Sequence, residues 1–205
     1  MMGGRLWNSA ASAALVSLLI VFGFCISSCF TDATRIHADF IVSSCQATTF
    51  RCLCVDSLSP YASVIRDSPM ELARSALSVS LSGARSAAAA VSKLAAEETL
   101  APREAAAVRD CMSTTGDSVD ELQRSLEAMG YPKGRGEAAV GLRLDDIQTW
   151  VSAALTDEDT CMDGIGGGRS TGGVVKVAIR RQIVNVAQLT SNALALINAL
   201  NSASP

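Results

Sequence analysis

The sequence predicts an all-α protein: an up-down-up-down four-helix bundle with an N-terminal helical hairpin and two disulfides. Three observations support this fold class. Ala and Leu supply most of the apolar residues, which make up 49% of the chain against only 4% aromatic residues, and this composition favours helix over sheet. Several long segments repeat apolar residues at steps of three and four. Cysteines recur behind an apolar N-terminal segment, the context in which disulfides form.

Residues 1–30 are predicted to be a secretory signal peptide. Arg5 supplies a positive charge, and the uncharged apolar run from Ala13 to Ile26 is shorter than the about 20 residues that a membrane span needs. Cleavage is expected between residues 27 and 33, which removes Cys25 and, depending on the site, Cys29. An uncleaved anchor is the alternative. No other segment is predicted to cross a membrane, so the mature protein is expected to be soluble and exported.

The first unit of the mature chain, residues 34–60, is expected to be a helical hairpin. Its first helix carries apolar residues at helical spacing: Ile36, Phe40, Ile41 and Cys45. Thr48-Thr49 is interpreted as a turn, and residues 52–58 as the second short helix. Because so small a unit has little core of its own, we expect a disulfide from Cys45 to a local partner to tie its two arms.

A long helix is predicted from about residue 69 to residue 98. Ser68, Pro69 and Glu71 form a capping box with proline at the first helical position. The helix is rich in alanine, which lets neighbouring helices approach closely. Its expected buried side is Leu72, Ala76, Val79, Gly83, Ala87 and Leu94.

A second long helix is predicted from Pro102 to about Met129. Residues at steps of three and four indicate one buried face: Val108, Cys111, Met112, Thr115, Val119, Leu122, Leu126 and Met129. Gly130 and Pro132 are expected to end the helix. The following stretch YPKGRGEAAVG is interpreted as a loop.

Two further helices are predicted over residues 145–163 and 174–200, joined by the flexible connector GIGGGRSTGG. The first of them buries Ile147, Trp150, Val151, Ala154, Leu155 and Cys161, with a kink expected near residues 156–159. The second has a packing seam of Ile179, Ile183, Val186, Thr190, Ala193, Ile197 and Leu200. Four long helices joined by modest loops form an up-down-up-down bundle.

Five cysteines remain if cleavage falls after Cys29: Cys45, Cys52, Cys54, Cys111 and Cys161. One of them must stay free or pair with another molecule, and composition alone does not choose the pairing. On an ordinary helix Cys52 and Cys54 point about 200° apart, so both cannot serve as the local partner of Cys45. Cys111 and Cys161 then remain to join the second and third long helices.

The sequence predicts no catalytic, cofactor or metal site. His37 is the single histidine and has no ligand spacing around it, so a surface or lightly packed role is expected. No GxSxG elbow occurs, and GIGGGRSTGG lacks the Lys-Ser/Thr ending of a phosphate loop. The acidic residues Asp145, Asp146, Asp157, Glu158, Asp159 and Asp163 do not match an EF-hand loop, and several are interpreted as helix-start residues. A formal charge of −3 argues against a nucleic-acid partner.

Four stretches, taken in order, carry a family likeness: SSCQATTFRCLCVDSLSPYA, RDCMSTTGDSVDELQRSL, WVSAALTDEDTCMDG and VNVAQLTSNALALINAL. Together they resemble the plant invertase and pectin methylesterase inhibitor family over residues 34–202, which we therefore take as one inhibitor domain. The resemblance implies the disulfides Cys45–Cys54 and Cys111–Cys161. Cys52 lies where relatives carry another residue, so it is expected to be the free thiol. The family fold is likewise a four-helix bundle with an N-terminal hairpin.

The resemblance also implies a function: a secreted, non-enzymatic inhibitor in the apoplast and cell wall that binds pectin methylesterase non-covalently and blocks its pectin-binding cleft. SAALTDEDTCMDG looks like the version in pectin methylesterase inhibitors. Invertase inhibitors carry Pro-Lys-Phe in the loop where this chain has Pro132-Lys133-Gly134, which weakens the invertase interpretation. The alternatives are an inhibitor of cell-wall or vacuolar acid invertase and a non-inhibitory apoplastic bundle.

The resemblance leads to further expectations about partners. The chain ends at Pro205 without a catalytic domain, so a free-standing inhibitor is expected, as a monomer or, alternatively, as a dimer linked through Cys52. No cofactor is expected. An acidic bundle is expected to bind a polyanion such as demethylated pectin poorly.

Overall fold

The computed structural model describes residues 36–96, 100–130, 137–166 and 173–202, without side chains for 137–142, 166 and 173–176. The described residues form helices and turns and no strand. The signal peptide expected over residues 1–30, its cleavage site at 27–33 and the loop sequence Pro132-Lys133-Gly134 lie outside the described residues.

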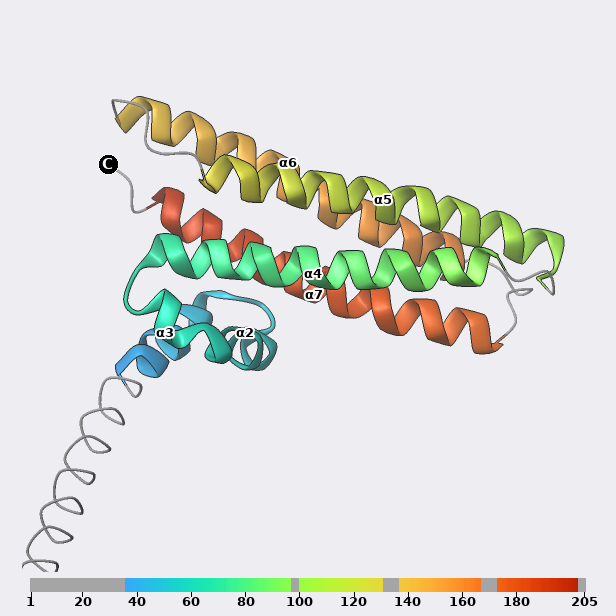
Figure 1. The fold of residues 1–205 in the computed structure, drawn as a ribbon, viewed down its shortest axis with the longest axis horizontal. Helices are drawn as coiled ribbons and strands as arrows, with labels where there is room; N and C mark the ends of the chain where they lie inside the picture. The colour runs from blue at the N-terminus through green and yellow to red at the C-terminus, as the bar shows by residue number, and fades with distance from the viewer. Residues whose placement is uncertain (1–35, 97–99, 131–136, 167–172, 203–205) are drawn as a thin grey trace, which may run out of the picture.

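Four long helices form an antiparallel up-down-up-down bundle, as the sequence predicts (Figure 1). Their bounds are α4, Pro69–Ala95; α5, Pro102–Gly130; α6, Glu137–Gly166; and α7, Gly173–Ser202. Helix α4 packs against α5 and α7, and α6 also packs against α5 and α7. Helices α5 and α7 therefore lie diagonally across the bundle, so their outer faces point in different directions.

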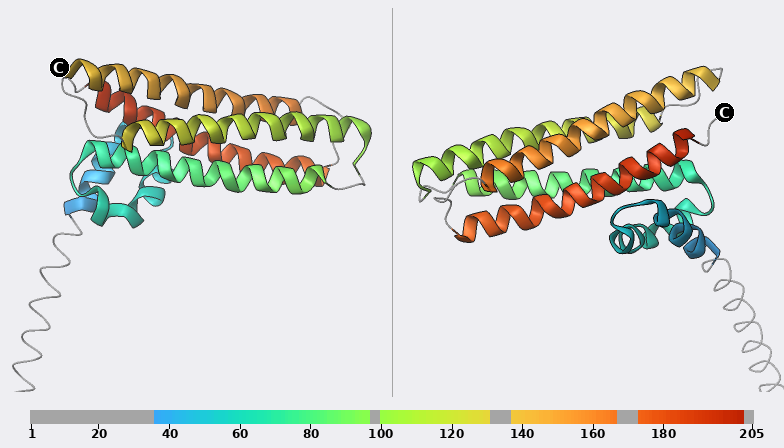
Figure 2. Two further views of the ribbon diagram at one scale, coloured as in Figure 1. Left: turned by 45° about the horizontal axis from the view of Figure 1, so that its top comes forward. Right: turned by 180° about the vertical axis from the view of Figure 1, so that it is seen from behind.

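The N-terminal unit is a compact helical hairpin. Residues 36–44 are helical, followed by η1 (Cys45–Ala47), α2 (Arg51–Leu58), η2 (Ser59–Tyr61) and α3 (Ala62–Ile65). The hairpin extends five residues beyond the predicted end at residue 60, because the chain continues in short helical turns as far as Ile65. It packs against α4 and α7, away from α5 and α6 (Figures 1 and 2).

One buried side chain attaches the hairpin to the bundle. The amide of Asn192 on α7 accepts a 3.0 Å hydrogen bond from the backbone N–H of Phe50 and donates a 2.9 Å bond to the Phe50 carbonyl. Asn192 is 3% exposed, so these bonds form away from solvent and satisfy backbone groups at the hairpin turn. The hairpin is thereby fixed beside the C-terminal half of α7.

The start of α4 follows the predicted capping box. The Ser68 hydroxyl accepts a hydrogen bond from the Glu71 N–H at 3.3 Å, and Pro69 is the first helical residue. The chain reaches this cap through Arg66, whose φ of 53° lies in the region that favours glycine. The helix ends at Ala95, before the predicted residue 98; residues 97–99 lie outside the described residues.

The predicted packing faces are confirmed for α7 and corrected for α4 and α5. Every predicted α7 seam residue through Ile197 is buried. On α5, Met112 is 39% exposed, while the buried face includes the unpredicted Ser118 and Ser125. On α4, Val79, Gly83 and Leu94 are only partly buried, and the core side is instead completed by Ala73, Ser75, Leu77, Ser80, Leu81, Ala84 and Val91. A bundle helix with two helical neighbours buries a wider stripe than a single seam.

Helix α6 is longer than predicted. It begins at Glu137, so the last part of the stretch interpreted as a loop is helical; alanines with a leading glutamate favour a helix start. The helix continues through residues 156–159, where the sequence suggested a kink. The acidic residues from Asp145 to Asp159 are therefore helix-interior residues, and their interpretation as helix-start residues is wrong.

Helix α7 corrects one expectation about membrane spans. Its segment Val177–Ser202 has a mean hydropathy of 1.4 and is long enough to cross a bilayer, although the sequence analysis expected no such segment. Half of an apolar stretch within this segment is buried within the bundle. Because α7 packs against α4, α6 and the hairpin, its apolar composition is accounted for by contacts with the rest of the protein.

Candidate functional site

The cysteines divide into buried and exposed positions. Cys45 is joined to Cys54 within the hairpin, and Cys111 of α5 to Cys161 of α6, with Cα atoms 5.8 Å and 4.4 Å apart. All four are buried. Cys52 is the free cysteine of the described residues, and it is exposed on α2. The joined sulfurs therefore serve the scaffold, and the Cys52 sulfur faces solvent.

A carboxyl group lies inside the bundle, among α5, α6 and α7. Glu158 is 1% exposed, and its Oε1 accepts hydrogen bonds from the hydroxyls of Ser118 at 2.8 Å and Thr190 at 3.0 Å. Its Oε2 has no hydrogen-bond partner among the described residues. Burial raises the pKa of Glu158 to about 7; the two hydroxyl bonds lower it, and the charges of Asp159 and Asp157 raise it further.

The burial of Glu158 was not predicted from the sequence, because Glu158 was grouped with the surrounding carboxylates. A signal was present, since Glu158 lies four residues after Ala154 and three before Cys161, both of which were predicted to be buried. A residue at these steps lies on the same helical face as its neighbours. The spacing alone therefore placed Glu158 on the buried side of the helix.

Five side chains lie near one another on the neighbouring helices α5 and α6. Asp117, Glu121 and Arg124 of α5 lie near Trp150 and Asp157 of α6, and we call these five residues the α5–α6 patch. The guanidinium carbon of Arg124 is 5.5 Å from the centre of the Trp150 ring, and an Arg124 nitrogen is 3.9 Å from Glu121 Oε1. Arg124 therefore links the aromatic and acidic parts of the patch.

The acidic part of the α5–α6 patch is electrostatically coupled. Partial burial, followed by the negative charges of Asp117 and Glu121, raises the pKa of Asp157 above its ordinary value. This influence requires the three carboxylates to lie close together, on two different helices. The α5–α6 patch consequently presents concentrated negative charge next to an arginine–tryptophan pair.

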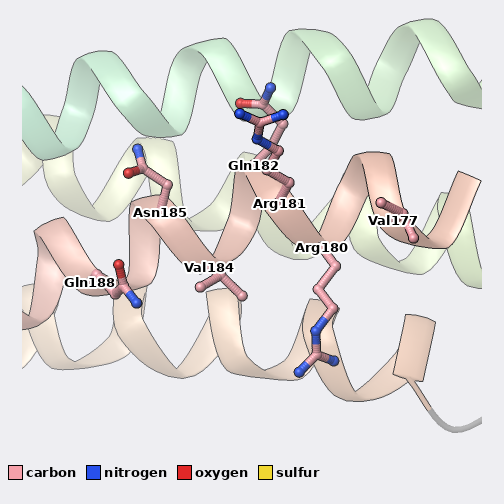
Figure 3. Close-up of a pocket in the computed structure, with 7 residues that line it drawn as sticks. All are labelled: Val177, Arg180, Arg181, Gln182, Val184, Asn185 and Gln188. Atoms are coloured by element: carbon pink, nitrogen blue, oxygen red, sulfur yellow. The ribbon is translucent and has the colours of Figure 1, made fainter.

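A second surface lies on the outer face of α7. A shallow groove of about 680 Å³ is lined by Val177, Arg180, Arg181, Gln182, Val184, Asn185 and Gln188. Figure 3 shows Arg181, Gln182 and Asn185 on one flank of α7 and Arg180 on the other. We call these seven residues the α7 groove. It ends at Gln188, about one helical turn before Asn192, where the hairpin is attached.

The described residues contain no group of three or more His, Cys, Asp or Glu side chains that could hold a metal ion. His37 is half-buried in the first helix of the hairpin, and its Nδ1 has no hydrogen-bond partner there. Neither the α5–α6 patch nor the α7 groove brings together a nucleophile and a base. The arrangement is that of a helical scaffold with two candidate binding surfaces.

A comparison with models of protein families identifies the family to which this scaffold belongs. The family model described as plant invertase/pectin methylesterase inhibitor matches residues 39–196, and the chain belongs to this family. The match includes both disulfides, Glu158, the α5–α6 patch and the α7 groove.

Curated relatives agree with this assignment. The chain is 47% identical to pectinesterase inhibitor 9 of Arabidopsis thaliana over 163 residues, covering 78% of this chain and 79% of that protein. It is 44% identical to pectinesterase inhibitor 10 of the same plant over 168 residues, which is 82% of this chain but only 53% of that protein, so the chain spans about half of that relative's length. It is also 43% identical to a 21 kDa protein of Daucus carota, covering 78% and 82% of the two chains.

Solved structures show the same fold. A crystal structure of a mutant form of a pectin methylesterase inhibitor from Arabidopsis matches with a TM-score of 0.60 at 21% identity, over 75% of this chain and 92% of that one. A crystal structure of a pectin methylesterase inhibitor from Arabidopsis thaliana matches with a TM-score of 0.52 at 19% identity, over 80% of this chain and 95% of that one. At these identities the likeness supports the helical-bundle fold.

Proposed function

We propose that this protein is a secreted inhibitor that binds pectin methylesterase non-covalently, covers its pectin-binding cleft and thereby regulates cell-wall pectin methylesterification. The name of the matched family and the names of the relatives supply the target class. The α5–α6 patch is the structural observation that carries the proposal. It offers an acidic surface to a cleft that must accept an acidic polymer.

The chemistry of pectin explains why an acidic surface suits this cleft. Its galacturonate units bear a carboxylate wherever the methyl ester is absent, so a cleft that holds the polymer must tolerate or favour negative charge. Asp117, Glu121 and Asp157 place three carboxylates on neighbouring helices, within mutual electrostatic reach. Complementary charge guides encounter and excludes wrong partners. The α5–α6 patch can therefore occupy the same cleft as the polymer.

Arg124 and Trp150 are the proposed anchors of this interface. Arginine and tryptophan are enriched among the interface residues that contribute most to binding. The Arg124 side chain is 54% exposed, and Trp150 is half-buried, so both can contact a partner from fixed positions. The disulfide between Cys111 and Cys161 joins the two helices that carry them. A surface ordered before binding loses less conformational entropy in the complex.

The remaining parts of the proposal concern secretion, domain bounds, catalytic activity and oligomeric state. Residues 1–30 act as the signal peptide, the inhibitor domain covers residues 34–202, and the protein works outside the cell in the apoplast and cell wall. It has no catalytic activity of its own. It acts as a monomer, since a specific interface of about 800 Å² per partner can be supplied by one bundle, and the Cys52-linked dimer is the alternative form.

The test is an inhibition assay with the purified mature protein and two enzymes, a plant pectin methylesterase and an acid invertase. We expect loss of methyl-ester hydrolysis that reverses on dilution. Inhibition of sucrose cleavage alone would assign the protein to the invertase inhibitors. No effect on several enzymes of either kind would reject the inhibitor proposal and favour a non-inhibitory bundle.

A further inference from the structure

The C-terminal part of the chain is positively charged, although the whole protein is acidic. Residues 164–205 contain Arg169, Lys176, Arg180 and Arg181 and no Asp or Glu, whereas the full chain has a formal charge of −3. The negative charge is therefore carried by the preceding helices. The expectation that an acidic bundle binds polyanions poorly treats the charge as uniform, and the sequence of α7 shows that it is not.

The two arginines of the α7 groove are available to a ligand. Arg180 and Arg181 are exposed, and no carboxylate within the described part of the chain lies within ion-pair distance of either one. By contrast, Arg74 and Arg124 each lie beside a glutamate on their own helix. A guanidinium group without an acidic neighbour keeps its full charge and donors for another carboxylate.

The rest of the α7 groove suits a hydroxyl-rich chain. Gln182 and Asn185 offer amide donors and acceptors on the flank of Arg181, and Gln188 offers another amide at the far end of the groove (Figure 3). Val177 and Val184 supply small apolar surfaces between these polar groups. From Val177 to Gln188 the groove follows α7 for about 16 Å at 1.5 Å per residue. An open groove of this length accommodates an extended polymer better than a compact small molecule.

The α7 groove lies on a different side of the bundle from the α5 part of the α5–α6 patch. Helices α5 and α7 lie diagonally across the bundle, so the outer face of α7 does not adjoin the outer face of α5. The hairpin lies beside the C-terminal half of α7, and Figure 2 shows the N-terminal half extending beyond it. The α7 groove and the α5 part of the α5–α6 patch therefore face in different directions.

We propose that the α7 groove binds a carboxylate-bearing galacturonan, the de-esterified form of pectin. Arg180 and Arg181 pair with carboxylates of the polymer, while the three amides bond its hydroxyls. The identity of the polymer rests on the proposed function, because a pectin methylesterase converts methyl esters of pectin into carboxylates. The inhibitor is thereby retained where its target enzyme has already acted.

The experiment measures binding of the mature protein to a fully de-esterified galacturonan oligomer, with no enzyme present. The matched ligand is the same oligomer with every carboxyl group methyl-esterified. We expect binding to the de-esterified oligomer only, and a marked loss of affinity between about 0.02 M and about 0.3 M salt. Equal binding to both oligomers, or no binding to either, would overturn the proposal.

Three double variants test the roles of Arg180 and Arg181. R180Q/R181Q is expected to weaken binding about tenfold, and R180K/R181K, which keeps the charge without the planar fork, to give an intermediate loss. The matched control is R103Q/R109Q, which removes the same charge from two exposed arginines of α5. Thermal unfolding checks that all three variants fold. An equal loss in the control would show a net-charge effect and reject the α7 groove.

Separate inhibition assays distinguish this inference from the proposed function. If R180Q/R181Q weakens enzyme inhibition but leaves galacturonan binding unchanged, the α7 groove contacts a protein and the polymer proposal is rejected. If the protein inhibits no enzyme but binds the de-esterified oligomer through Arg180 and Arg181, the α7 groove stands and the inhibitory function fails.

Discussion

Glu158 of α6 accepts a 2.8 Å hydrogen bond from the Ser118 hydroxyl of α5 inside the bundle. A second hydroxyl, from Thr190 of α7, bonds the same oxygen at 3.0 Å. One ionisable group thus connects three of the four long helices. A buried carboxyl group with one oxygen unpartnered is stable in its protonated form and costly when ionised.

The fold is therefore expected to lose stability as the pH rises. Unfolded Glu158 releases its proton near pH 4.5, and folded Glu158 near pH 7. Between these values the folded state binds more protons than the unfolded state, so the free energy of unfolding falls with pH and levels off above about 7. A pKa difference of this size corresponds to about 3 kcal/mol. Urea unfolding curves recorded between pH 4 and pH 8, in steps of about one pH unit, measure how the free energy of unfolding depends on pH.

Glu158→Gln tests the assignment, because glutamine keeps the acceptor for Ser118 and Thr190 but does not titrate. We expect this variant to be close to the wild type in stability near pH 4 and about 3 kcal/mol more stable near pH 8. Asp146→Asn, at an exposed position of the same helix whose charge is not among those that raise the pKa of Glu158, is the control and should keep the wild-type slope. A slope that persists in Glu158→Gln would assign the pH dependence to another group.

The α5–α6 patch leads to a prediction about inhibition. Arg124→Ala is expected to weaken inhibition of pectin methylesterase about tenfold, since it removes the charged half of the Arg124–Trp150 pair. Arg74→Ala is a closely matched control: each arginine has a glutamate three residues earlier, at 3.8 Å for Arg74 and 3.9 Å for Arg124, and each is about half exposed. The inhibition constant is the measurement.

Trp150→Phe complements this test, because phenylalanine keeps most of the packing but binds a cation less well than tryptophan. A smaller loss than that of Arg124→Ala is expected, without a change in the unfolding midpoint. Unchanged inhibition in both Arg124→Ala and Trp150→Phe would remove these residues from the interface.

The sequence was sufficient to predict the bundle because its helices are defined by local signals. The capping box at Ser68 and the regular α7 seam from Ile179 to Ile197 are examples, and both agree with the structure. The start of α6 was missed because glycines around Arg135 obscure a helix that begins at Glu137. Local patterns do not show how far tertiary packing extends a helix.

The binding surfaces were less predictable. The α5–α6 patch depends on which residues of α5 face which residues of α6, and the register of two neighbouring helices is not visible in one sequence. The α7 groove required knowledge of how much of α7 the hairpin covers, which depends on the contact between Phe50 and Asn192. The absence of acidic residues after Asp163 was visible in the sequence from the start.

The two disulfides are expected to stabilise the fold unequally. Cys111–Cys161 spans 50 residues and Cys45–Cys54 spans 9. Because a longer closed loop restricts the unfolded chain more, C111S/C161S should lose about 4 kcal/mol and C45S/C54S about 3 kcal/mol. Urea unfolding without reductant gives both values.

A count of reactive thiols tests the disulfide pairing. The mature wild-type protein, unfolded without reductant, should alkylate at Cys52 alone, and Cys52→Ser should not react. Two or more reactive thiols in the wild type would contradict the pairing. A disulfide-linked dimer that disappears in Cys52→Ser would show that Cys52 joins two chains.

Adding a side chain at two helical glycines is predicted to change the stability of the protein in opposite directions. A Cβ at Gly116 in α5 meets nothing within 4 Å, so Gly116→Ala should stabilise the protein by about 1 kcal/mol through higher helix propensity. At Gly83 in α4 a Cβ lies 3.4 Å from Leu189 Cδ1 and 3.5 Å from Val186 Cγ2. Gly83→Leu should therefore force α4 and α7 apart and cost about 1–3 kcal/mol. Equal thermal unfolding midpoints for the two variants would contradict the packing described here.

Asn192 is predicted to hold the hairpin against α7. Asn192→Ala removes both hydrogen bonds to Phe50 and leaves the Phe50 N–H without a partner, whereas the Phe50 carbonyl keeps its 2.9 Å bond from the Cys54 N–H; the cost is about 1–3 kcal/mol. Because the hairpin is joined to the bundle at one end only, through α4, we expect it to detach locally while the four long helices remain folded. Hydrogen exchange should then accelerate in α2 and remain slow in α5 and α6. Asn192→Asp keeps the acceptor for the Phe50 N–H and should give a smaller acceleration. If exchange rises equally in all helices, Asn192 supports the whole bundle and the hairpin is not an independently detaching unit.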